Sequence, residues 1–142
     1  MLDGMGGASG TALDLAAFTQ LFANRGRCGD RQLLHPTSVA RMTTDQIPGV
    51  PAYFFDQTLR SGSMGFGWLE AQTEPMVGWP TLPLGSITHG GAGLVMPWVD
   101  PSAGVVGVFC SVADRYRSST NPGDVRHQAD LFANLVTAST VD

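Results

Sequence analysis

The segment His89-Gly90-Gly91-Ala92 places one imidazole beside two glycines at the end of an apolar run with the composition of a β-strand. An imidazole can donate a hydrogen bond to a carboxylate or assist proton transfer near neutral pH. Two glycines at a strand end let another molecule approach the backbone closely, and exposed backbone N–H groups there can stabilise a developing oxyanion. A solvent-facing histidine in a glycine-rich bend is the alternative interpretation.

The elements around this segment predict an α+β fold with helices packed on an antiparallel sheet. Apolar segments at 86–89, 94–99 and 105–112 are predicted to be neighbouring strands, and the turn sequence DPSAG joins the last two as a hairpin. The stretch GFGWLEAQ is expected to be a further strand. Residues 47–65, rich in proline, glycine and aromatic side chains, are expected to form a long irregular connection.

Helical spacing of apolar residues predicts two helices before these strands. The first begins with a capping arrangement of Thr11 and Asp14 and ends near Gly26, a candidate for the C′ position. The second has Pro36 in its first turn, where a missing N–H costs nothing.

A last helix is predicted over 124–137, after the turn sequence NPGD. One apolar stripe along it is expected to be buried on the sheet, formed by Val125, Ala129, Phe132 and Val136. Cys110, in an apolar strand, is expected to be buried packing, and Cys28 and Cys110 to be free thiols.

The composition of the chain excludes several kinds of site and partner. The chain has 142 residues, with eight arginines and no lysine, so no catalytic lysine and no Walker A loop can be built. A net charge of −4 gives no reason to expect a nucleic-acid partner. Neither the two cysteines nor the three histidines have metal-ligand spacing, so we expect no metal and no cofactor. No apolar run is long enough to span a membrane.

The segment around His89-Gly90-Gly91 resembles the third motif of the serine β-lactamase-like hydrolases, the family of class C β-lactamases, D-alanyl-D-alanine carboxypeptidases and related esterases. That motif is Lys-Thr-Gly in the lactamases and often His-x-Gly or His-Gly-Gly in the esterase-like members. Four further segments resemble other parts of the family in the expected order, so the resemblance extends from about residue 6 to 136. They are GGASGTALDLAAFTQLFANRG, RQLLHPTSVARMTTDQIPG, GFGWLE and NPGDVRHQADLFANLV.

The resemblance also shows what the chain lacks. The family's nucleophile lies in Ser-x-x-Lys, and its second motif, Tyr-x-Asn or Tyr-x-Ser, precedes all of these segments. A chain without lysine has no Ser-x-x-Lys, so it resembles the C-terminal part of such a hydrolase, with residues 1–142 expected to form a single region of it. Ser9 and Ser63 are other candidate nucleophiles, but neither has an elbow turn or an evident base.

Site roles follow from the resemblance. His89 is implied to contact the substrate or the deprotonated nucleophile network, and the backbone N–H of Ala92 to be one oxyanion donor. Gly90 and Gly91 would keep the wall open for the acyl group, and Trp79, in a proline-rich loop, is the tryptophan expected to touch ligand. The implied substrate is a small ester, lactam or peptide; a histidine in the third motif favours esterase-like activity.

The expected partners of the chain follow from the absence of the N-terminal half of the family's fold. In the complete fold the sheet mixes strands from both ends of the chain, so this chain is expected to dimerise, to bind a separate N-terminal polypeptide, or to aggregate. A charged fraction of 14% suits a surface that is partly covered. A non-catalytic binding or assembly module is the alternative function. Residues 1–10 lack the pattern of a signal peptide, and the location, cytoplasmic or exported, stays open.

Overall fold

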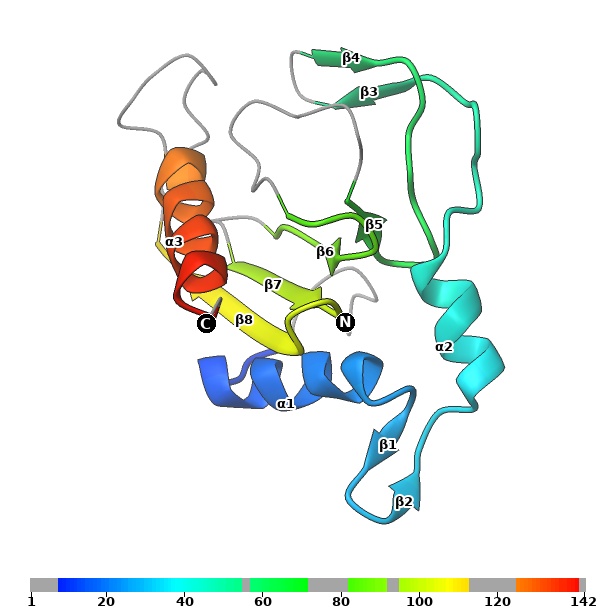
Figure 1. Cartoon of the computed structure of the whole chain (residues 1–142), viewed down its shortest axis with the longest axis vertical. Coiled ribbons are helices and arrows are strands. Elements are labelled where there is room, and N and C mark those ends of the chain that lie inside the picture. The colour runs from blue at the N-terminus through cyan, green and yellow to red at the C-terminus, as the bar shows by residue number, and fades with distance from the viewer. Residues whose placement is uncertain (1–7, 55–56, 72–81, 92–94, 113–124, 141–142) are drawn as a thin grey trace.

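The fold is α+β, as the sequence predicts. The computed structural model describes residues 8–54, 57–71, 82–91, 95–112 and 125–140. Within these residues a four-stranded antiparallel sheet has the order β5-β6-β7-β8 (Figure 1). Its strands are β5 (Leu69–Glu70), β6 (Ile87–Thr88), β7 (Val95–Asp100) and β8 (Val105–Cys110). The predicted adjacency of the last three strands is confirmed.

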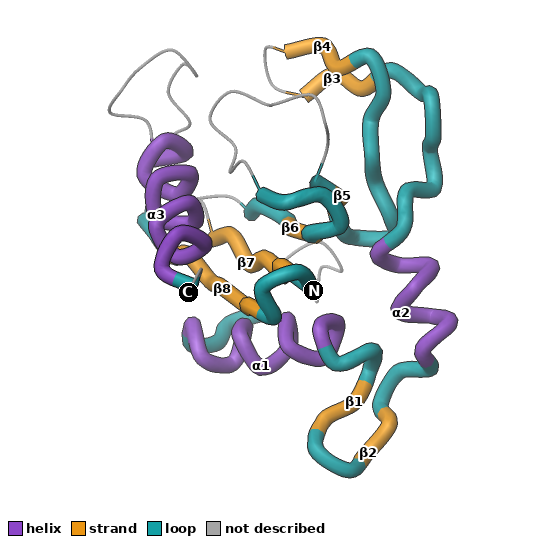
Figure 2. Tube along the Cα trace, in the orientation of Figure 1, coloured by secondary structure: helices purple, strands orange, loops and turns teal. Residues whose placement is uncertain are grey.

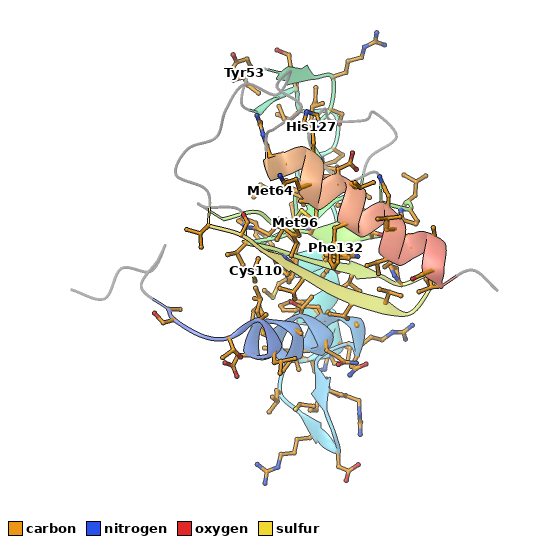
Figure 3. The ribbon with its side chains drawn as sticks, turned by 90° about the vertical axis from the view of Figure 1, so that its left-hand side faces the viewer. Tyr53, Met64, Met96, Cys110, His127 and Phe132 are labelled. Carbon is orange, nitrogen blue, oxygen red and sulfur yellow. The ribbon has the colours of Figure 1, made fainter. Side chains whose placement is uncertain are left out.

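Helices cover both faces of this sheet. In Figure 3, α3 (Val125–Ser139) lies on one side of β7 and β8, and α1 (Ala12–Ala23) lies on the other. Between α3 and the sheet the core consists of Leu82, Met96, Trp98, Ala129 and Ala133. On the opposite face α1 and α2 (Pro36–Thr43) enclose Phe22, Val39, Trp68, Ile87 and Val99. Alternation along β6 and β7 therefore sends neighbouring residues into two separate cores.

The turn sequence DPSAG between β7 and β8 is stabilised by hydrogen bonds to the side chain of its first residue, Asp100. The Oδ1 atom of Asp100 accepts hydrogen bonds from the Ser102 N–H at 2.9 Å, the Ser102 hydroxyl at 2.6 Å and the Ala103 N–H at 3.2 Å. Asp100 is buried, and these bonds replace the water that its Oδ1 atom loses, whereas its Oδ2 atom has no partner among the described residues.

The first helix has the predicted start and a slightly different end. Thr11 and Asp14 form a reciprocal capping box. The helix ends at Ala23 with Asn24 as its C-cap, so Arg25 takes the C′ position with a φ of 52°, and Gly26 follows with a φ of 87°. The Gly26 N–H donates to the Leu21 carbonyl at 2.7 Å, which makes this a Schellman end. The predicted C′ position was therefore one residue late.

The connection at 47–65 is not wholly irregular, and this part of the prediction was wrong. It contains a small hairpin of β3 (Ala52–Phe54) and β4 (Gln57–Leu59) (Figure 2). Another hairpin lies outside this connection, directly after α1, and pairs β1 (Arg27–Cys28) with β2 (Arg31–Gln32). Strands of two or three residues are too short to show a hydrophobic period. The α2 helix starts at Pro36, as predicted, with His35 as its N-cap.

The last helix is present, but its buried stripe is shifted. Ala129 and Ala133 are fully buried, and Val136 packs against the same core. Phe132 contacts Trp98 and Phe109 yet stays 41% exposed, because it lies above β8, the last strand of the described sheet. The side chain of Val125 lies outside the described residues. Cys110 is exposed, so its predicted burial was wrong, for the same reason: β8 has no described neighbour on its outer edge.

Candidate functional site

The His89-Gly90-Gly91 segment continues the ladder of β6 along β7. The N–H of His89 donates to the Pro97 carbonyl at 3.3 Å, and the N–H of Gly91 donates to the Val95 carbonyl at 3.0 Å. The hydroxyl of Thr88 also donates to the Pro97 carbonyl, at 2.9 Å. The backbone of the segment is therefore held by a central strand, while the His89 side chain is exposed.

Gly91 is not required by the packing of the described residues. A Cβ built at this position would meet only the Val95 carbonyl oxygen, at 3.8 Å, an ordinary contact, and its φ is not in the left-handed region. Gly107 is the opposite case, because a Cβ there would overlap the ring of Trp98. The fold thus explains the glycine at 107, whereas no described neighbour of Gly91 requires a glycine at that position.

A cavity of about 390 Å³ lies at the same end of the sheet. Its wall includes Val95, the residue that accepts the Gly91 N–H, and the exposed Cys110 at the end of β8. The segment that leads into α1 forms the rest of the wall, from Ala8 to Leu15 except Leu13. Two glycine-rich stretches far apart in sequence are in this way brought to one end of β7 and β8.

Asp14 is the charged residue among those that line this cavity, and its carboxylate is hydrogen-bonded in the cap of α1. The N–H of Thr11 donates to its Oδ2 at 2.8 Å, and so does the Thr11 hydroxyl, at 2.8 Å. The backbone hydrogen bond, followed by the hydroxyl, holds the pKa of Asp14 below its ordinary value of 3.8. The carboxylate of Asp14 therefore stays ionised at neutral pH and keeps its two hydrogen bonds from Thr11.

The other predicted site residues have mixed outcomes. Ala92 and Trp79 lie outside the described residues, so the oxyanion N–H and the aromatic contact stay predictions. Gly90 is half-buried and Gly91 exposed. Trp68 and Trp98 are core residues, with Trp68 packed edge-on against Phe22 at 4.8 Å between ring centroids.

One serine has a partner that the sequence reasoning missed. The Ser63 hydroxyl donates to Oε2 of Glu70 at 3.1 Å, although the two residues are seven apart. An isolated bridge between Met64 and Leu69 turns the chain back between them, a local event without a periodic signal. Serine nucleophiles are activated by an adjacent base, most often histidine or lysine. The partner of Ser63 in this bond is a carboxylate, so we interpret this hydrogen bond as a structural link between β5 and the loop before it.

The other two histidines belong to helices, His35 at the start of α2 and His127 within α3. His35 is exposed, and its Nδ1 accepts the Thr37 N–H at 3.3 Å, which caps α2. His127 is half-buried on α3. Among the residues that the structure describes, no three His, Cys, Asp or Glu side chains gather as metal ligands. No helix in the described part of the chain has the length and apolar character to cross a membrane.

A larger cavity of about 650 Å³ lies at the other end of β6 and β7. Apolar side chains of α1, α2 and the sheet line this cavity, and Arg25 and Glu70 also contribute to its wall. Gly85 and Pro101 mark its position at the start of β6 and the end of β7, whereas His89 follows the end of β6. The cavity is therefore separate from the His89 segment.

Comparison of the sequence with protein-family models and with curated proteins finds no match. Among solved structures, a β-lactamase from Mycobacterium bovis is similar, with a TM-score of 0.64 and 20% identity over 85% of this chain and 43% of that one. The chain thus has a β-lactamase-like fold and spans less than half the length of that protein.

Proposed function

We propose that this chain is the C-terminal portion of a serine hydrolase of the β-lactamase-like family, which acts on ester, amide or lactam bonds through an acyl-enzyme. Its part is the His89-Gly90-Gly91 wall of the active site. The proposal rests first on one observation: in a β-lactamase-like fold, a strand-anchored histidine is followed by a glycine that the described packing does not need.

The proposed chemistry divides between this chain and a nucleophile outside it. A serine activated by lysine attacks the carbonyl carbon of the substrate, and the carbonyl oxygen becomes an oxyanion. The N–H of Ala92 is the donor that this chain would contribute to that oxygen. The exposed imidazole of His89 would bind the acyl side of the substrate or hydrogen-bond the nucleophile network. A bare Gly91 leaves room for the acyl group.

The test uses the longer product of the same gene, provided that the upstream frame encodes Ser-x-x-Lys and Tyr-x-Asn or Tyr-x-Ser. Hydrolysis of p-nitrophenyl acetate and nitrocefin is measured for that protein and for His89→Ala and Gly91→Ala. Both variants are expected to lose roughly 10²-fold in kcat/KM, since they touch the reacting groups. His35→Asn, which replaces another exposed histidine and keeps an N-cap side chain, is expected to retain activity. Equal activity of all three variants would refute the proposed site.

A second function is favoured by the missing lysine. A chain that carries no Ser-x-x-Lys and works alone would be a binding or assembly module built on the same fold. An upstream frame without the two motifs, together with a stable complex formed by the 142-residue chain, would support this function over the first.

A further inference from the structure

The cavity of about 650 Å³ at the start of β6 has its walls on both helices of one sheet face and on the sheet itself. Its lining comes from the end of α1, from α2 and from the ends of β5, β6 and β7. No residue of β8 contributes to it, so the cavity lies away from the strand at which the rest of the proposed hydrolase would continue the sheet. A cavity of this volume suits a small organic ligand.

The floor of this cavity is apolar and firmly packed. Phe22 and Val39 contribute to it from α1 and α2, and Ile87 and Val99 contribute from the sheet. All four side chains belong to one core cluster and are at most 6% exposed. The floor is therefore formed before any ligand binds, and it favours apolar groups of a ligand over water.

Two side chains of opposite charge lie on the wall of the cavity. Arg25 follows the end of α1, and Glu70 is the last residue of β5. The Oε2 atom of Glu70 accepts the Ser63 hydroxyl at 3.1 Å, which holds the carboxylate in place. Within the described part of the chain, no ion pair joins Arg25 to Glu70. The cavity thus offers one cationic and one anionic group to its contents.

The conformation of Arg25 points to a use for its side chain. Its φ of 52° is in the left-handed region, where glycine is the usual residue at the C′ position of a helix. The backbone is held there, because the Arg25 N–H donates to the Phe22 carbonyl at 3.1 Å and the Arg25 carbonyl accepts the Gln32 amide at 2.9 Å. An arginine at a position that favours glycine is explained if its guanidinium binds a ligand in the cavity.

We propose that this cavity binds a dipeptide with apolar side chains and free ends. The guanidinium of Arg25 binds the terminal carboxylate, for which its paired N–H groups are suited, and the carboxylate of Glu70 binds the terminal ammonium. The apolar side chains lie on the floor. An extended dipeptide spans up to about 7 Å, so it can reach two charged groups that do not touch each other. This proposal does not depend on the hydrolase function, since His89 follows the opposite end of β6.

Isothermal titration calorimetry with three related probes tests the two charges. Leu-Leu carries both end charges, N-acetyl-Leu-Leu lacks the ammonium, and Leu-Leu amide lacks the carboxylate. The 142-residue chain should bind one Leu-Leu, and each blocked probe should bind about tenfold or more weakly, because one charged hydrogen-bonded contact is lost. Equal affinity for the three probes, or no binding of Leu-Leu, would overturn the proposal.

Two variants assign each charge to its side chain. Arg25→Gly removes the guanidinium and suits the left-handed backbone, so the variant should be at least as stable to heat as the unmodified chain. It should bind Leu-Leu about tenfold or more weakly and bind Leu-Leu amide with unchanged affinity. Glu70→Gln keeps an acceptor for Ser63 and should show the converse pattern, with the affinity for N-acetyl-Leu-Leu unchanged.

Arg27→Gln is the matched control, because Arg27 is also exposed and lies two residues from Arg25 but does not line the cavity. It should leave the affinity for Leu-Leu unchanged. A loss of Leu-Leu binding in Arg27→Gln equal to that in Arg25→Gly would overturn the site. So would an Arg25→Gly protein that loses Leu-Leu and Leu-Leu amide equally. The same titration applies to the longer product of the gene, where the loss of Leu-Leu binding would mean that the N-terminal half fills the cavity and would also overturn the proposal.

Discussion

Replacing Gly107 by alanine drives a methyl group into the ring of Trp98. The added Cβ would overlap three ring atoms, and the glycine lies at the middle of β8 directly opposite Trp98. Trp98 is 0% exposed and has Phe132 edge-on at 5.9 Å between ring centroids, so the ring has little room to retreat. Overpacking of a core costs about 1–3 kcal/mol, and the upper end applies to this position. For a chain of this size, about 3 kcal/mol lowers the Tm by roughly 10 °C.

Thermal unfolding followed by circular dichroism measures this loss, with Gly91→Ala as the control. The control methyl meets only the Val95 carbonyl oxygen at 3.8 Å among the described residues, so its Tm should change by less than about 2 °C. A Gly107→Ala protein as stable as the control would contradict the pairing of Trp98 with Gly107. The β7–β8 register, and with it the position of α3, would then be wrong.

Two further predictions concern the turn and the first helix. Asp100→Ala removes the acceptor of the Ser102 hydrogen bonds and should lower the free energy of unfolding, measured in urea, by about 2 kcal/mol. Asp100→Asn keeps an acceptor oxygen and should lower it by less. Equal losses in the two variants would contradict the hydrogen bonds of the turn. The pKa of Asp14 is lowered in the folded chain, so its stabilising contribution is complete above pH 3.8 and is lost as the pH falls through the lowered pKa. Stability should therefore fall less steeply below pH 3.8 in Asp14→Asn than in the unmodified chain, and parallel pH profiles would contradict the capping box.

The elements with strong local signals could be predicted from the sequence. The capping residues of α1, the proline that starts α2 and the DPSAG turn each act over a few residues, and all three are in place. The β6-β7-β8 order followed from short connections between apolar runs. In contrast, the exposure of Cys110 and Phe132 depends on which strand is the last in the sheet, a property of the assembled layers.

The candidate site could be predicted in part. His89 and its glycines were found because an imidazole beside two glycines suits a site and because the segment resembles the third motif of the β-lactamase-like hydrolases; the structure anchors their backbone on β7. That no described side chain packs closely against Gly91 could not be predicted, since it depends on how the neighbouring elements pack. The bond between Ser63 and Glu70 was missed for a similar reason: the local reversal that joins them has no period and no turn motif.

The central claim is that this chain forms an active-site wall and that the nucleophile lies elsewhere. Incubation with a fluorophosphonate and with a fluorescent penicillin, followed by intact mass measurement, tests it most directly. The 142-residue chain should remain at its unmodified mass, and the longer product of the gene should gain one adduct on an upstream serine of Ser-x-x-Lys. A stoichiometric adduct on the short chain, at Ser9, Ser63 or any other serine, would contradict the account.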